Sequence, residues 1–554
     1  MTDTTALNFI NKSQTSALLL LCECRGKIVT SPIVESVRMQ ARDGFAGLHV
    51  RIVDNLCSQP HKVGEAIAEC KPSSVVIGAC HGEGYDAVWE GCAAETGLPP
   101  FFIETVDLLS LSSPDNTPRA GAAICSALSH QRAFKQVPLH AIRPARLKTD
   151  AKLSRRSLLR LSFTRRYEII PWIESGKCAG PQGCDLCMNT CLSKAIDPKS
   201  ARINRSECVN CGLCLSKCPT GALEVPGFRP LEIGAAIAPM IDSGAMRSRI
   251  IIFTIGQSPS AWHELADNKA LQGILTFHLP YENLLTPWLL LLPLTLGADG
   301  VGVFHNHPEG SSREGKLKEM IEFTNTLMNR SGATEKTAEV FNFRNINAVR
   351  ITLEEFCHKL AHNRIGKLPV TLSDISYLEG PKSFSKLLKQ LWSGNNKAIE
   401  PIVHIASPIA MINLDTDKCS TCGLCADRCP TGALKDNNTE RGYSLTFEHA
   451  MCSGCGICEN MCPEKALHLF RRIEPNLISG NVRLELGFFP IELCSSCHSP
   501  IETGSRSQIL SQRLNKTNSL AFAGLNRSLS LCQQCRRKQI FASARKDPLK
   551  SEVC

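Results

Sequence analysis

The residues most able to do chemistry in this 554-residue chain are its 29 cysteines, most of which stand in closely spaced groups. Three runs share the spacing Cys-x-x-Cys-x-x-Cys-x-x-x-Cys-Pro, and they begin at Cys208, Cys419 and Cys452. Three thiolates spaced in this way wrap one [4Fe-4S] cluster in a single tight loop, and the fourth thiolate turns toward a neighbouring cluster. The runs therefore predict bacterial ferredoxin-type iron–sulfur binding rather than zinc binding.

A fourth run has a longer first gap, because five residues separate Cys178 from Cys184, and Leu192 follows it in place of proline. We expect it to hold a cluster whose potential or exposure differs from the others. Crossed ligation within each pair of runs then predicts four ligand sets. They are Cys178, Cys184, Cys187 and Cys218; Cys191, Cys208, Cys211 and Cys214; Cys419, Cys422, Cys425 and Cys462; and Cys429, Cys452, Cys455 and Cys458.

Two further knuckles, Cys494-x-x-Cys497 and Cys532-x-x-Cys535, have no third cysteine of the ferredoxin kind. Four thiolates in two knuckles suit tetrahedral zinc in a closed structural site, which is our prediction. Rubredoxin-type iron and a redox-active disulfide pair are the open alternatives. The cysteines without partners in the sequence are expected to be packing residues or surface thiols: Cys70, Cys92, Cys125, Cys357 and Cys554.

Helices and strands must position these cysteines. In residues 16–130, apolar runs alternate with amphipathic stretches. This alternation predicts strands near Ala17–Leu21, Leu48–Val53, Val75–Ala79 and Phe101–Glu104, with helices near Pro32–Arg42, Val63–Cys70 and Tyr85–Thr96. Such alternation is typical of a parallel sheet. The carboxyl ends of its strands would bring together Cys22, Cys24, Cys57 and Cys80, which could hold a fifth iron–sulfur cluster. Burial of these thiols as small packing residues is the alternative.

Residues 246–360 repeat this rhythm, with strands predicted near Ile250–Ile255, Ile274–Phe277 and Val301–Phe304. Their ends carry no cysteine. His305 and His307, with Glu309 nearby, could bind a metal, but His-x-His is weak evidence, and we predict a loop of polar surface residues instead. The apolar run Leu284–Leu296 is shorter than the about 20 residues that span a membrane, so it predicts a buried helix.

The overall composition indicates a folded protein of several domains, because 43% of the residues are hydrophobic and only 21% are charged. No signal peptide is recognisable, so a soluble protein of the cytoplasm, where thiols stay reduced, is expected. The segment 132–166 has eleven basic residues and one acid. It predicts a solvated linker, with a docking strip for an acidic partner as the alternative. Nucleic-acid binding is not expected, because only Phe134 and Phe163 interleave with these charges.

No Gly-x-Gly-x-x-Gly follows a predicted strand, and no P-loop is present. We therefore expect neither a flavin nor an NAD site. No Ser/His/Asp or Cys/His nucleophile can be placed either, so the chain is predicted not to be an enzyme by itself but to transfer electrons within an oxidoreductase system.

Two local resemblances refine these predictions. The segments Leu21–Ile28, Leu56–Ser58 and Val76–Cys80 resemble the N-terminal domain of heterodisulfide-reductase-A proteins, in which such cysteines bind a cluster. Arg25 departs from that pattern, which usually has glycine. The segment Leu296–Val303 resembles the delta subunit of methyl-viologen-reducing hydrogenases, which implies a domain that kept this fold, lost its cluster and retains a docking role.

The order of parts along the whole chain resembles bacterial multi-cluster ferredoxins linked with formate dehydrogenases, and Cys419–Asn437, Cys452–Arg472 and Cys494–Arg537 carry the likeness best. It implies a soluble relay of single electrons to or from a redox enzyme such as a formate dehydrogenase. A component of a heterodisulfide-reductase-like thiol or sulfur redox complex and a metalloenzyme assembly factor are the alternatives.

The predicted fold class is multidomain α/β plus α+β. It comprises two small parallel-sheet α/β domains, two 2[4Fe-4S] ferredoxin domains and a zinc-ribbon-like knuckle. The predicted parts are a heterodisulfide-reductase-A-like domain at 1–131, a basic linker at 132–170, a ferredoxin domain at 171–228, a hydrogenase-delta-like domain without a cluster at 229–405, a second ferredoxin domain at 406–478 and a zinc-binding tail at 479–554.

Overall fold

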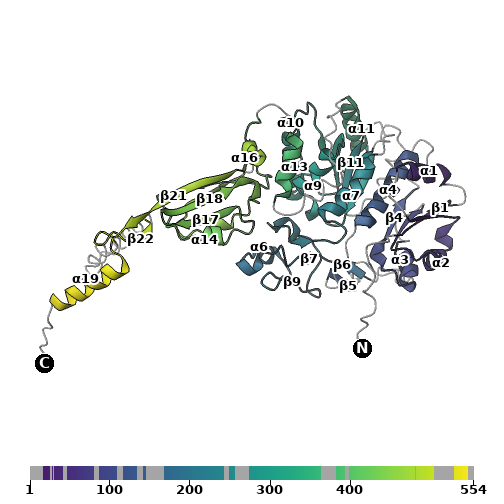
Figure 1. Cartoon of the computed structure of the whole chain (residues 1–554). Helices are drawn as coiled ribbons and strands as arrows, with labels where there is room; N and C mark the ends of the chain where they lie inside the picture. The colour runs from purple at the N-terminus through teal and green to yellow at the C-terminus, as the bar shows by residue number, and fades with distance from the viewer. Residues whose placement is uncertain are drawn as a thin grey trace, which may run out of the picture. The chain divides into compact units, whose positions relative to one another are not determined.

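The computed structural model describes residues 16–24, 28, 30–40, 47–79, 86–108, 117–133, 141–144, 167–242, 249–255, 274–362, 382–393, 399–480, 482–503 and 530–546. The chain divides into two compact units, shown in Figure 1. The first unit comprises Met1–Cys178 and Asp185–Ala398, and the second comprises Ala179–Cys184 and Ile399–Cys554.

The first unit contains two parallel four-stranded sheets with the same strand order. One sheet has the order β2-β1-β3-β4, formed by β1 (Ala17–Cys22), β2 (Leu48–Val53), β3 (Ser74–Ala79) and β4 (Ile103–Asp107). The other has the order β12-β11-β13-β14, formed by β11 (Ile250–Ile255), β12 (Ile274–Leu279), β13 (Gly300–His305) and β14 (Ala338–Asn342). Every strand predicted in these two regions is confirmed within a few residues.

The central strands are continuous apolar runs because helices cover the sheets. In β1, Leu18–Leu21 are fully buried. The helices of the first α/β domain are α1 (Thr30–Gln40), α2 (His61–Cys70), α3 (Asp86–Glu95) and α4 (Thr117–Ala133). Strands that are buried on both faces in this way are typical of parallel sheets.

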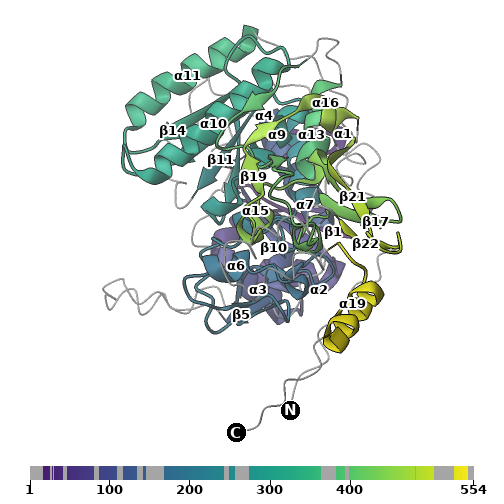
Figure 2. The same cartoon turned by 90° about the vertical axis from the view of Figure 1, so that its left-hand side faces the viewer.

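The second α/β domain has the helices α7 (Pro230–Asp242), α9 (Pro287–Thr295), α10 (Ser312–Arg330), α11 (Ile346–His362) and α13 (Ser383–Trp392). Helices α10 and α11 pack against β14, as Figure 2 shows, and α7 packs along α4 of the first domain. The predicted buried helix is confirmed as α9, whose leucines are buried. No helix in the described ranges is long and apolar enough to cross a membrane.

Short elements make up the first cysteine-rich region, which lies between the two α/β domains in the chain. They are β7 (Trp172–Ile173), α6 (Leu186–Thr190), β8 (Ile196–Asp197), β9 (Arg202–Ile203), the 3-10 turn η8 (Leu215–Lys217) and β10 (Leu223–Glu224). Strand β10 pairs antiparallel with β7 and closes this region. Within the predicted basic linker, β5 (Ile142–Pro144) pairs antiparallel with β6 (Tyr167–Ile169), and most of the intervening basic residues lie outside the described ranges.

The second unit is built on antiparallel pairs. Two short pairs join β15 (Ile402–Val403) to β20 (Arg472–Ile473) and β16 (Met411–Leu414) to β19 (Leu467–Phe470). The short helices are α14 (Leu424–Asp427), α15 (Ile457–Met461) and α16 (Pro475–Ser479).

An antiparallel sheet of the second unit has the order β17-β18-β21-β22, from β17 (Leu434–Thr439), β18 (Gly442–Glu448), β21 (Arg483–Leu493) and β22 (Pro500–Thr503). Strand β21 begins beside Glu448, to which Arg483 donates at 2.8 Å, and ends immediately before Cys494. Helix α19 (Gln533–Lys546) follows the last knuckle. One continuous strand therefore joins the second cysteine-rich region to the C-terminal knuckles.

Candidate iron–sulfur and metal centres

The clearest candidate centre is a hollow in the second unit. Four thiols line it together with apolar side chains. The thiols are those of Cys419, Cys422, Cys425 and Cys462, and the apolar wall includes Leu414, Leu424, Tyr443 and Leu467. Two separate cysteine runs contribute to this wall, as crossed ligation requires. The donor set fits a [4Fe-4S] cluster.

The thiols beside this hollow form a second group, which includes Cys429 from the first of the two runs. The pKa of Cys452 is raised to about 11, mainly by burial and to a smaller degree by the thiols of Cys455 and Cys429, against backbone hydrogen bonds that lower it. The pKa of Cys458 is also raised, first by burial and then by Cys452, Cys455 and Cys429. Buried thiols that oppose one another's ionisation need a cation in order to become thiolates, and iron would supply that charge.

Backbone N–H groups point at several of these sulfurs. The donors are Leu434 to Cys429 at 3.4 Å, Ala466 to Cys462 at 3.3 Å and Gly454 to Cys452 at 3.4 Å, and in the first unit Ala222 donates to Cys218 at 3.2 Å. Such bonds stabilise negative charge on a ligating sulfur and so adjust the potential of a cluster.

Left-handed backbone explains how the loops close so tightly. In three runs, the residues on both sides of the second cysteine have positive φ angles. They are Asn210 and Gly212 around Cys211, Thr421 and Gly423 around Cys422, and Gly454 and Gly456 around Cys455. Around Cys184, only the preceding Gly183 does, because Asp185 has a φ of −127°. The longer fourth run therefore has a different loop conformation.

In the first unit, thiols from both runs share one small core. Cys187 and Cys214 are buried in it, and Cys178, Cys191 and Cys218 pack against it. The pKa of Cys214 is raised to about 12, by burial first and then by Cys208, Cys187, Cys211 and Cys191. Cys191 therefore lies near the loop that begins at Cys208. Cys211 is exposed, and Cys184 is half-buried in the short segment grouped with the second unit.

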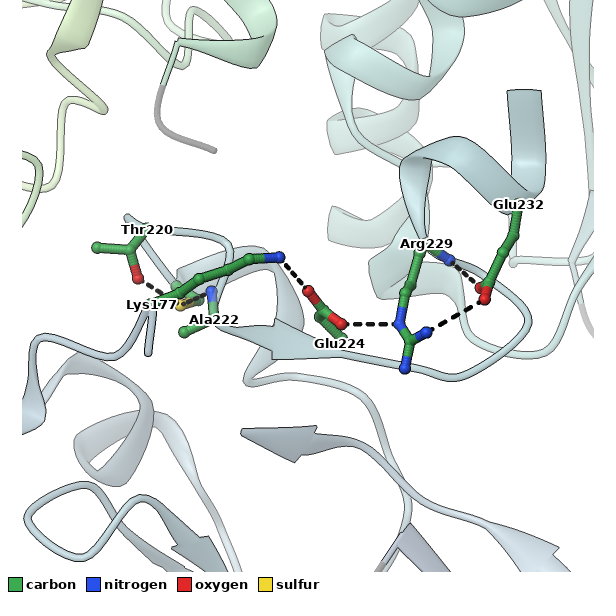
Figure 3. Close-up of polar contacts among 7 residues, drawn as sticks. Lys177, Thr220, Ala222, Glu224, Arg229 and Glu232 are labelled. Atoms are coloured by element: carbon green, nitrogen blue, oxygen red, sulfur yellow. Dashed lines mark hydrogen bonds and ion pairs between the residues drawn. The ribbon is translucent and has the colours of Figure 1, made fainter. Parts of the chain in front are cut away.

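A chain of charged side chains extends from this core to α7, as Figure 3 shows. Lys177, which precedes Cys178, lies 2.6 Å from Glu224 Oε1, and Glu224 Oε2 lies 2.8 Å from Nε of Arg229. Arg229 also pairs with Glu232 on α7 at 3.3 Å, and its guanidinium lies over the Trp172 ring. These contacts could not be predicted from the sequence, because no spacing between residues indicates them.

The C-terminal knuckles form a tighter site than the ferredoxin loops do. The sulfurs of Cys494, Cys497, Cys532 and Cys535 all lie within 4.8 Å of one another. Ligands about 2.3 Å from a central zinc in a tetrahedron are roughly 3.8 Å apart, so the spacing suits one metal ion. The backbone N–H of Cys532, 3.2 Å from the Cys494 sulfur, is the main cause that lowers the pKa of Cys494 to about 7. The donor set fits a metal that binds thiolates.

The N-terminal cysteines are partly brought together at the carboxyl edge of the first sheet. Cys22 and Cys24 are buried with their sulfurs 3.0 Å apart, and Leu56 donates its N–H to Cys22 at 3.3 Å. That bond places the turn η1 (Leu56–Ser58), which carries Cys57, beside the end of β1. Cys80 lies outside the described residues, so the fifth cluster stays a prediction.

The prediction for His305 and His307 was wrong. Both are buried rather than part of a surface loop, because His305 is the last residue of the interior strand β13. Their rings stack with centroids 5.3 Å apart, and His307 Nε2 lies 3.0 Å from Glu282 instead of contacting the exposed Glu309. Within the described ranges, the two histidines do not belong to a group of three side chains whose ligand atoms are close enough to hold one metal ion.

The cysteines without sequence partners are packing or half-buried residues where they are described. Cys125 and Cys357 are buried, and burial raises the pKa of each to about 12. Cys70 and Cys92 are half-buried, and Cys554 lies outside the described residues.

Comparison with known families supports the ferredoxin-type interpretation of three runs. Residues 201–224, 412–435 and 445–468 each match the 4Fe-4S binding domain family. Each matched segment contains one complete run that ends in Cys-Pro, and Cys178–Cys191 lies outside all three. A search among curated proteins gives no match to the chain. The chain thus contains three segments of the 4Fe-4S binding domain family, which support an iron–sulfur protein that transfers electrons.

Proposed function

We propose that the chain relays single electrons through four [4Fe-4S] clusters to or from a redox enzyme. The hollow lined by Cys419, Cys422, Cys425 and Cys462 is the observation that carries this proposal most directly. A bound cluster would supply reversible one-electron chemistry between its 2+ and 1+ states. The four ligand sets are those given by crossed ligation of the runs, including the unmatched run that begins at Cys178.

Three features of the protein support such a relay: coupling between neighbouring ligand sets, hydrogen bonds to sulfur, and cysteines exposed at the surface. The two sets in each pair share a core, so electrostatic interaction reaches from one set to the other, as between Cys425 and Cys458. The backbone N–H donors to sulfur stabilise the ligating thiolates. The exposed Cys211 and Cys422 give each pair an edge at the protein surface where an electron can enter or leave.

The partner we propose is an oxidoreductase such as a formate dehydrogenase, on the basis of the resemblance in the order of parts. We also propose zinc for the C-terminal site and a cytoplasmic location. Zinc suits the tetrahedral spacing and the lowered pKa of Cys494, and the cytoplasm keeps unpaired thiols reduced.

The first experiment is to measure iron, sulfide and zinc per chain on anaerobically purified protein. About sixteen irons and one zinc are expected for four cubes and one zinc site. The variant Cys458→Ser should lower the iron content, while the control Cys357→Ser, which changes a buried cysteine outside the sets, should not. Protein that lacks iron after anaerobic purification and reconstitution would contradict the proposal.

A second candidate function rests on the contact between Cys22 and Cys24 at the carboxyl edge of the first sheet. A cluster there would favour a role within a heterodisulfide-reductase-like thiol or sulfur redox complex. About twenty irons per chain would support it, and a return to about sixteen in Cys24→Ser would locate the extra cluster. An assembly factor remains the third candidate, and rapid reduction of the clusters by a ferredoxin reductase system would count against it.

A further inference from the structure

We propose that the second α/β domain, which has no cysteine at its described strand ends, adjusts the redox potential of the cluster held by the Cys208–Cys214 loop. Tyr281 and Asn283 would be the positioning residues. This inference rests on the proposed function, because it requires a cluster in that loop.

The contacts come from the segment that follows β12. The Tyr281 hydroxyl lies 2.8 Å from Asn210 Oδ1 and 3.0 Å from the carbonyl oxygen of Ile169. Asn210 donates its own side-chain amide to the same carbonyl at 3.1 Å. Tyr281, Asn210 and the carbonyl of Ile169 thus contact one another pairwise, and Asn210 belongs to the cysteine loop.

Asn210 is a position where support from outside the loop matters. Its φ is +56°, in the left-handed region that asparagine adopts more easily than most residues but less easily than glycine. The corresponding position in the run that begins at Cys452 is Gly454, which adopts this conformation without the steric cost of a side chain. The contact with Tyr281 therefore helps to hold a loop conformation that asparagine adopts less easily than glycine.

Asn283 and the ring of Tyr281 hold the next part of the loop. Asn283 donates its side-chain amide to the carbonyl oxygen of Cys211 at 3.3 Å. A Cβ atom on Gly212 would lie 3.0 Å from Cβ of Tyr281, so the tyrosine packs closely on the backbone there. Both residues flanking the exposed Cys211 are therefore in contact with this one tyrosine.

These contacts lie at one edge of the sheet of the second α/β domain. Tyr281 and Asn283 follow the carboxyl end of β12, and that edge of an open α/β sheet is where ligands usually bind. In this domain, the neighbouring cysteine loop lies against that edge. Cluster potentials depend on hydrogen bonds near the sulfurs and on access of water, and both depend on how firmly the loop is held.

The test is Tyr281→Phe in the full-length protein, purified anaerobically. This change removes only the hydroxyl. The measurements are iron and sulfide content, the midpoint potential of each cluster from a redox titration followed by electron paramagnetic resonance, and the rate of cluster bleaching in air. We expect wild-type iron content, an upward shift of one potential among the clusters and faster bleaching of that cluster. Water admitted by a looser loop stabilises the reduced, more negatively charged cluster.

Asn283→Ala provides a second variant, with the exposed Asn329→Ala as its matched control. It should shift the same potential, and the control should shift none. Unchanged potentials in both Tyr281→Phe and Asn283→Ala would overturn the inference. Loss of iron without any shift in the remaining clusters would also overturn it, because the residues would then be structural only. Wild-type protein without iron would instead contradict the proposed function itself.

Discussion

Arg229 and Glu224 form a buried ion pair, with Nε 2.8 Å from Oε2 and side chains that are 5% and 9% exposed. The pair joins β10, beside the first cysteine-rich core, to the start of α7 (Figure 3). Lys177 forms an ion pair with the other carboxylate oxygen of Glu224, and Glu232 forms one with Arg229. A buried charge that loses its partner destabilises the structure, because its desolvation is no longer compensated.

Glu224→Gln should therefore destabilise the first unit. Removal of one partner of a buried ion pair typically costs about 3–5 kcal/mol. The loss here should be smaller, about 1–3 kcal/mol, because Glu232 still neutralises Arg229. The measurement is the thermal unfolding midpoint under anaerobic conditions, with the exposed Glu335→Gln as the control. Equal midpoints for Glu224→Gln and the control would show that the pair does not hold β10 to α7.

His130 should make stability depend on pH. Burial lowers its pKa, but Glu104 at 2.8 Å and the carbonyl of Gly227 at 2.6 Å outweigh that effect and raise the pKa to about 9. A group whose folded-state pKa is raised stabilises the fold below its unfolded value, about 6.5. That stability is lost as the pH rises through about 9.

The comparison that checks this is wild type against His130→Gln across pH 6 to pH 10. Near pH 6 the wild type should unfold at the higher temperature, and its free energy of unfolding should exceed that of His130→Gln by on the order of 2–3 kcal/mol. This difference in free energy should shrink by pH 10. A difference that stays constant over this range would show that the charge on His130 contributes nothing.

The two ferredoxin pairs should lose their clusters independently. Cys211→Ser removes a predicted ligand in the first unit, and Cys458→Ser removes one in the second unit. Each should lose about four to eight irons per chain, because one cube is lost and its neighbour in the shared core is weakened. Electron paramagnetic resonance of the reduced variants should retain the signals of the untouched pair. Loss of all signals in either variant would mean that the pairs are not separate centres.

Removal of a C-terminal thiol should remove zinc without removing iron. In Cys497→Ser, three thiols remain, and zinc should fall from one per chain to a small fraction, since a closed structural site needs four ligands. Elemental analysis of zinc and iron in the same sample is the measurement. Cys92→Ser, which changes a half-buried cysteine on α3, is the control. Loss of iron together with zinc would indicate that iron occupies the C-terminal site.

The chemistry and much of the local structure were predictable from the sequence, because both depend on short spacings. Cysteines separated by two or three residues predict cluster loops, and Cys-Pro marks the end of three of the four runs. The apolar run of Leu18–Leu21 predicts a buried parallel strand. These features depend on neighbours a few residues away, so one sequence is enough to recognise them.

Contacts across long separations were decided by the tertiary structure alone. Tyr281 forms a hydrogen bond with Asn210, and His307 pairs with Glu282. His305 is buried because β13 lies inside its sheet. Which strand lies inside a sheet, and which loop covers its edge, follows from topology and packing over the whole domain. No spacing between single residues carries that information, so the middle domain's contacts with the cysteine loop became visible only in the fold.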